Sequence, residues 1–182
     1  MGNVRDGIDQ PLRDWIRAQH VFFVATAPSG DDGRVNVSPK GMADTFAFVG
    51  NAGCAYLDLT GSGAETVAHL RQNGRITLMW AAFDGPARIV RIHGRGRVVL
   101  PDAEEWVALS AAFGEHRGAR SVIVVDVERV SDSCGYAVPK MDFVEERSRL
   151  EEWAGNRTDA ELVEYRARKN AVSIDGLAAF DP

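Results

Sequence analysis

In the stretch RVNVSPKG, residues 34–41, polar and apolar side chains alternate strictly from Arg34 to Ser38. Val35 and Val37 point to one side of an extended chain. The other side carries the polar residues Arg34, Asn36 and Ser38, and Lys40 follows at the strand end. A period of two residues is typical of a β-strand with one buried and one polar face. We therefore expect a strand here, with its valines in the core and its polar face open to a ligand.

More strand-like runs flank this stretch at short intervals. They cover residues 21–27, 46–49, 55–59, 75–81, 88–100 and 121–130, and the run at 88–100 reads as one long strand or as a pair. Turn signals separate them, at residues 28–33 and at Asp84-Gly85-Pro86. This spacing favours a mainly β fold with flanking helices, an antiparallel barrel or sandwich, over repeated βαβ units.

Helices are expected between and after the strands, at residues 12–19, 62–73, 102–113, 145–153 and 158–170. Two of them open on capping-box patterns, Ser62 with Glu65 and Thr158 with Glu161. The helix at 102–113 is amphipathic and should bury Trp106, Leu109 and Phe113. The apolar tail at 173–177 should pack, on its own subunit or on a partner. We interpret residues 1–182 as a single domain whose helical C-terminal extension covers about 145–182.

Composition excludes several classes of protein. The net charge of -5 argues against nucleic-acid binding, which needs a basic face. No apolar run approaches the ~20 residues of a membrane span. The four histidines and the two cysteines, Cys54 and Cys134, show no metal-ligand spacing, so no metal site is expected. Two free thiols and the lack of a hydrophobic signal core favour a cytoplasmic protein.

A second segment, LTGSGAET at residues 59–66, passes from a strand through a glycine-containing turn into a helix. Glycines let backbone N–H groups approach a ligand, and a helix N-terminus favours anions. The hydroxyls of Thr60, Ser62 and Thr66 add donors, so this segment and residues 34–40 could together hold a phosphate and a polar ring. The alternative is a simple capping box, in which the Glu65 carboxylate would repel a phosphate.

Five segments, taken in order, resemble the pyridoxamine 5'-phosphate oxidase-related FMN-binding proteins. They are FFVATA at 22–27, RVNVSPKG at 34–41, YLDLTGSGAET at 56–66, NGRITLMW at 73–80 and RIVRIHG at 88–94. The resemblance covers about residues 11 to 130, and the tail NAVSIDGL at 170–177 resembles one branch of the group. It implies an FMN-binding split β-barrel, antiparallel and Greek-key-like, that forms a homodimer with two FMN sites built from both subunits.

The resemblance also implies where the cofactor lies. The strand from Arg34 to Lys40 would run along the flavin, the segment from Thr60 to Thr66 would approach the ribityl phosphate, and Arg88 would lie near the cofactor. The candidate cofactor-binding residues are Arg34, Asn36, Val37, Ser38, Lys40, Thr60, Gly61, Ser62, Gly63, Thr66 and Arg88. No catalytic residue is assigned, because the isoalloxazine ring itself carries out hydride or electron transfer.

This chain departs from the true oxidases at two places. Those enzymes carry a Ser-Arg-Lys phosphate clamp where this chain has Gly, Ala, Glu and Thr, and their basic C-terminal substrate motif has no counterpart here. The substrate is therefore expected to differ from pyridoxamine 5'-phosphate. We expect an FMN-dependent oxidoreductase acting on a small organic molecule. The alternative is a flavin-, deazaflavin- or tetrapyrrole-binding module without turnover.

Overall fold

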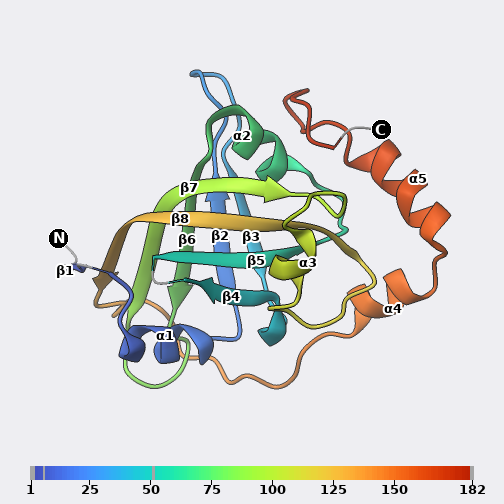
Figure 1. Ribbon diagram of the computed structural model, residues 1–182. Helices are drawn as coiled ribbons and strands as arrows, with labels where there is room; N and C mark the ends of the chain where they lie inside the picture. Colours follow the sequence, from blue (N-terminus) through green and yellow to red (C-terminus); the bar gives the residue numbers. More distant parts are fainter. Residues whose placement is uncertain (1–2, 6, 51, 181–182) are drawn as a thin grey trace.

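The computed structural model describes residues 3–5, 7–50 and 52–180, and its centre is an antiparallel sheet (Figure 1). The hydrogen-bonded order is β3-β2-β6-β7-β8-β5-β4, and β1 pairs with β8. The eight strands are β1 (Asn3–Arg5), β2 (Phe22–Thr26), β3 (Asn36–Lys40), β4 (Phe46–Val49), β5 (Gly53–Leu59), β6 (Arg75–Ala81), β7 (Ile89–Val99) and β8 (Ala119–Ser133). The expected mainly β, antiparallel fold is confirmed.

The connections place strands that are distant in sequence next to one another. Strands β6, β7 and β8 follow one another as a meander, whereas the chain passes from β3 at one end of the order to β4 at the other. Strand β5 then pairs with β8 over its whole length. Within the described residues the ladder does not close into a ring, since β3 and β4 are its two ends.

Strand β7 shows how the alternating pattern becomes a sheet. It is one strand of 11 residues, with Val90 and Ile92 fully buried and Arg91, Arg95 and Arg97 on the other face. The register with β8 shifts between His93 and Gly94, which marks a β-bulge. A Cβ atom at Gly94 would collide with the carbonyl oxygen of Asp126, so this close approach of two backbones requires glycine.

Five α-helices and one 3₁₀ turn flank the described part of the sheet. They are α1 (Gln10–Arg17), the 3₁₀ turn (Ala43–Thr45), α2 (Glu65–Asn73), α3 (Trp106–Ser110), α4 (Arg149–Gly155) and α5 (Asp159–Lys169). Helix α5 opens on the expected capping box of Thr158 and Glu161. Helices α4 and α5 lie together at one side of the sheet, apart from α1 (Figure 1). None of the helices in the described ranges has the length and apolarity to cross a membrane.

Three expected helices differ from those observed. The prediction of a capping box at Ser62 is wrong. Helix α2 begins at Glu65, its N-cap residue is Ala64, and no side chain caps it. The helix expected at 102–113 shrinks to the five residues of α3, although its three apolar side chains do pack, half-buried, against the core. The helix expected from residue 145 begins only at Arg149, because residues 145–148 offer no apolar face to bury.

The core lies on both faces of the central strands. The larger cluster includes Tyr56, Trp80 and Ile92, and the smaller one includes Leu57 and Val122. The tail was expected to pack on its own subunit or on a partner; within this chain its Leu177, and Phe180 just beyond it, lie against the larger cluster. The Ser173 N–H donates to the Leu177 carbonyl at 2.9 Å, which closes the tail into a turn.

The expected burial of Val35 and Val37 is wrong. Their side chains are 69% and 63% exposed, while the polar face of β3 is half-buried. The inward face is the polar one, since Asn36 finds hydrogen-bond partners there in Thr26 and Thr66.

Candidate functional site

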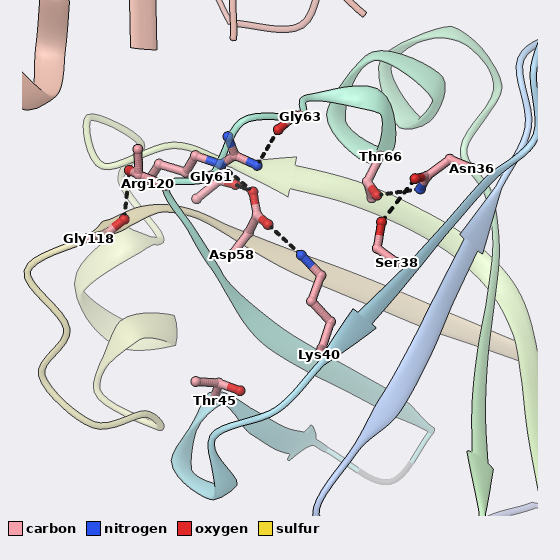
Figure 2. A network of polar contacts seen from close by, with 12 residues as sticks. Asn36, Ser38, Lys40, Thr45, Asp58, Gly61, Gly63, Thr66, Gly118 and Arg120 are labelled. Atoms are coloured by element: carbon pink, nitrogen blue, oxygen red, sulfur yellow. Dashed lines mark hydrogen bonds and ion pairs between the residues drawn. The ribbon is translucent and has the colours of Figure 1, made fainter. Parts of the chain in front are cut away.

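A buried carboxylate, Asp58, lies at the centre of a polar network inside the fold (Figure 2). It is on β5, where Cys54, Tyr56 and Asp58 alternate toward the larger core cluster. Its Oδ1 accepts a hydrogen bond from Lys40 Nζ at 3.1 Å, and its Oδ2 accepts one from Arg120 Nε at 2.7 Å. Strands β3, β5 and β8 each supply one of these three charges.

The charge state of Asp58 follows from these partners. Burial alone raises the pKa of a carboxyl, but Lys40 and Arg120 outweigh it and lower the pKa of Asp58 to about 2. Asp58 is therefore ionised at neutral pH. Two cations face one anion, so the group as a whole keeps a positive charge.

Arg120 also fixes the loop between β5 and α2. Its Nη2 donates to the Gly63 carbonyl at 2.9 Å, and its Nη1 donates to Asn170 Oδ1 at 2.8 Å. The Asn170 amide in turn donates to the Gly61 carbonyl at 2.9 Å. The loop is thus tied both to β8 and to the residue that ends α5.

Thr60 joins the same loop to the C-terminal helices. Its backbone N–H and its hydroxyl both donate to the Gly118 carbonyl, at 2.7 and 2.8 Å, and Arg166 Nε donates to its Oγ1 at 2.9 Å. Burial and the nearby Arg120 lower the pKa of Arg166. Lys40, Arg120 and Arg166 thus outnumber the two nearby carboxylates, Asp58 and the less buried Glu65, which favours an anion there.

A second set of hydrogen bonds links β3 to α2. Asn36 Nδ2 donates to Thr66 Oγ1 at 3.1 Å and to Thr26 Oγ1 at 3.2 Å. Ser38 Oγ donates to Asn36 Oδ1 at 2.9 Å. Figure 2 shows this set beside the charged one, so that the polar face of β3 contacts both β5 and the first turn of α2.

A cavity of about 730 Å³ opens at the charged network. Lys40, Thr60 and Gly61 line one part of its polar side. Another part of the polar lining is mainly acidic and comprises Asp84, Asp142, Glu145, Glu146 and Arg147. Its apolar lining includes Leu57, Leu59, Phe83, Met141, Phe143 and Leu150. The Phe143 ring stacks on His20 at the cavity wall, with ring centroids 3.7 Å apart. The volume lies within the roughly 300–1,000 Å³ of small-molecule sites.

The fold brings together seven of the residues expected to bind a cofactor: Asn36, Ser38, Lys40, Thr60, Gly61, Gly63 and Thr66. Arg34 is directed elsewhere, since it pairs with Asp175 of the tail at 2.5 Å. Arg88 pairs with Asp132 at 2.8 Å and lies over the Trp15 ring. Val37 and Ser62 are exposed. The cofactor role of each of these residues stays a prediction.

Sequence reasoning missed the residues that hold this site in place, namely Asp58, Arg120, Arg166 and Asn170. A signal existed for Asp58, because a carboxylate at an inward position of an apolar strand needs buried cations as partners. Arg120 offers a weaker signal, as a charge directly before the apolar run of β8. Nothing in the local sequence marks Arg166, and Asn170 was marked only as the first residue of the tail that resembles one branch of the family. Both reach the site through the packing of α5.

Comparison with known proteins gives consistent matches. The sequence profile of the family "Pyridoxamine 5'-phosphate oxidase" matches residues 8–134. The protein named "Pyridoxamine 5'-phosphate oxidase family protein ustO", from Aspergillus flavus, is 38% identical over 189 residues, covering 94% of this chain and 75% of that protein.

Two solved structures share the fold at low sequence identity. HupZ of Group A Streptococcus is 20% identical, with a TM-score of 0.54, over 74% of this chain and 99% of that one. HutZ, the heme storage protein from Vibrio cholerae, is 16% identical, with a TM-score of 0.50, over 71% of this chain and 97% of that one.

Proposed function

This chain belongs to the pyridoxamine 5'-phosphate oxidase family, and we propose that it is a flavin-dependent oxidoreductase that binds FMN and acts on a small organic substrate. One observation carries the proposal. Lys40, Thr60 and Gly61, expected from the sequence to contact FMN, line one side of a cavity that also has an apolar wall formed by residues such as Leu57, Leu59 and Phe83. The family assignment alone does not decide between an enzyme and a binding protein.

The residues present fit the phosphate end of FMN. The N-terminus of α2 has no side-chain cap, and Lys40, Arg120 and Arg166 leave a positive excess beside the loop that leads into it. Unsatisfied N–H groups and cations are what a phosphate requires. Glu65, the acidic residue of the first turn, opposes this positive charge: its Oε1 accepts a hydrogen bond from the Ile174 N–H at 3.2 Å, and its Oε2 lies close to Gly63 of the loop.

The cavity also fits the isoalloxazine ring of FMN. Leu57, Leu59 and Phe83 offer an apolar wall against which a planar ring system can pack. When bound, the flavin ring supplies hydride or electron transfer. The protein holds the Lys40 ammonium in place through Asp58, orients the polar face of β3 through Asn36, and excludes water with its apolar wall.

The network around Asp58 accounts for the altered loop sequence. This chain lacks the Ser-Arg-Lys clamp at the start of α2. Hydrogen bonds from Arg120 to the Gly63 carbonyl and from Asn170 to the Gly61 carbonyl hold the loop in place instead. A loop that is already positioned binds an anion without a further ordering cost. The changed loop is therefore compatible with flavin binding, and we propose a substrate other than pyridoxamine 5'-phosphate.

Reduction of the bound flavin tests this function. The purified protein is loaded with FMN, and NAD(P)H is added without oxygen. We expect the flavin absorbance to bleach and to return in air, and we expect the Lys40→Ala variant to bind FMN more weakly. Lys169→Ala, at an exposed lysine of α5, is the matched control. If FMN binds but no electron donor reduces it, the oxidoreductase proposal is refuted and the protein is a flavin-binding protein without turnover.

A second candidate is tetrapyrrole binding without turnover. The observation in its favour is His20, whose imidazole lines the same cavity, because histidine is a common axial ligand of heme iron. Hemin titration decides between the two candidates. A Soret band that His20→Ala abolishes, together with no FMN binding, would favour the second candidate. Deazaflavin would fill the same cavity as FMN and is distinguished by the absorbance of the bound ligand.

We also propose that the chain forms a homodimer. Val37 of the end strand β3 and Val35, which precedes the strand, are exposed, and an apolar edge strand that faces water invites pairing with another chain. Light scattering of the FMN-loaded protein should give twice the monomer mass, and a monomer at micromolar concentration would refute the dimer. Both cysteines are free thiols, which supports the reducing cytoplasm as the proposed compartment.

A further inference from the structure

A second cavity lies against the same loop. It has a volume of about 600 Å³ and is lined mainly by residues of α4, α5 and the turn between them. It shares Thr60, Gly61 and Leu150 with the first cavity. The two cavities therefore meet at the loop where the positive charge is concentrated.

An aromatic pair forms part of the lining of this second cavity. The rings of Trp153 and Tyr165 meet edge to face, with centroids 4.9 Å apart. The guanidinium of Arg157 lies 4.0 Å from the centroid of the Trp153 ring, and its Nη1 donates to the Trp153 carbonyl at 2.6 Å. Aromatic rings and guanidinium planes held in this way are the surfaces on which nucleobases stack.

The charges of the lining also suit a nucleotide. Arg149 and Arg157 face one carboxylate, Glu152, so the lining carries a net positive charge. The Arg149 side chain is 88% exposed, and its Nη1 lies 3.5 Å from Glu152 Oε2. An exposed pair of this kind is weak and can be exchanged for a phosphate. Asn156 adds an amide that can donate to or accept from the edge of a base.

We propose that the second cavity binds the adenosine phosphate half of a flavin dinucleotide whose FMN half lies in the first cavity. The proposal rests on the proposed flavin function and extends it. A ligand with phosphates at its middle and a ring at each end matches two cavities that meet at a cationic loop.

Titration of the apo protein with FAD and with FMN tests the proposal. We expect FAD to bind at least about tenfold more tightly, the scale of one stacked base. Trp153→Leu and Arg149→Ala should each weaken FAD about five- to tenfold and change the FMN affinity less than about twofold. Arg168→Ala, at an exposed arginine of α5 outside the cavity, is the matched control for Arg149. Arg149 is on the surface, so its variant remains informative if Trp153→Leu fails to fold.

The outcomes separate this proposal from the one it rests on. Equal affinities for FAD and FMN would overturn the dinucleotide and leave the flavin function intact. Binding of neither flavin would end both proposals. AMP should compete with FAD but not with FMN. NADH that binds the FMN-loaded protein through Arg149, with no preference for FAD, would assign the cavity to a separate nucleotide and overturn the proposal.

Discussion

Replacing Asp58 by asparagine should destabilise the protein strongly at neutral pH and much less in acid. Asp58 is 1% exposed and faces both Lys40 and Arg120. Its loss leaves these two cations without their shared carboxylate. Removing one partner of a buried ion pair costs about 3–5 kcal/mol, because the remaining charge has lost its compensation.

The pH dependence of this loss is set by the same contacts. A carboxyl pKa that falls from 3.8 to about 2 on folding corresponds to roughly 2–3 kcal/mol of stability, at about 1.4 kcal/mol for each pKa unit. Because the folded pKa is the lower one, this contribution is fully present above the unfolded value. It is lost as the pH falls through about 2. The wild type and the Asp58→Asn variant should therefore converge in acid.

Urea unfolding followed by tryptophan fluorescence measures both effects. At about pH 7 we expect the variant to lose about 3 kcal/mol, and at the lowest pH where both proteins fold we expect the difference to shrink. Asp126→Asn, at an exposed carboxylate on β8, is the control and should change stability by less than about 0.5 kcal/mol. A variant as stable as the wild type at neutral pH, or a loss that does not depend on pH, would refute this account of the charged network.

Three further predictions concern the loop and its ligand. Lys40→Ala should weaken FMN binding by about 1–3 kcal/mol in a fluorescence titration, the scale of one hydrogen bond to a charged group. Ser62→Ala should leave the thermal midpoint nearly unchanged, because the hydroxyl caps no helix, whereas Thr158→Ala should cost about 0.5–2 kcal/mol by removing the cap of α5. Glu65→Gln should tighten FMN about two- to fivefold, since it removes a negative charge from the N-terminus of α2, and weaker binding would show that the carboxylate positions the loop.

Much of the sheet can be predicted from periodicity, because a strand buried on one face must alternate. Strand β7 is the clearest example, and the capping box of α5 was likewise readable from Thr158 and Glu161 alone. Which face of β3 is buried was not predictable in this way. Alternation shows that two faces differ, but which one is buried depends on the partners that Asn36 finds in Thr26 and Thr66.

The candidate site was predictable where its residues follow one another along the chain, as in the segments around Lys40 and Thr60. Its charged centre was not, because Asp58 and Arg120 are 62 residues apart and meet only through the pairing of β5 with β8. The second cavity depends on α4 and α5, whose placement no local pattern encodes. Arg34 shows the reverse case. Its place in the polar segment predicted contact with a ligand, but in the structure it forms an ion pair with Asp175 of the tail.

The identity of the molecule that the protein retains tests the central claim most directly. The protein is purified from cells, denatured, and the released small molecules are identified by mass spectrometry, with the absorbance spectrum recorded before denaturation. We predict a flavin nucleotide, at a ratio approaching one per chain, and its loss from the Lys40→Ala variant. Heme as the released ligand, or an apo protein that takes up no flavin at micromolar concentration, would contradict the account.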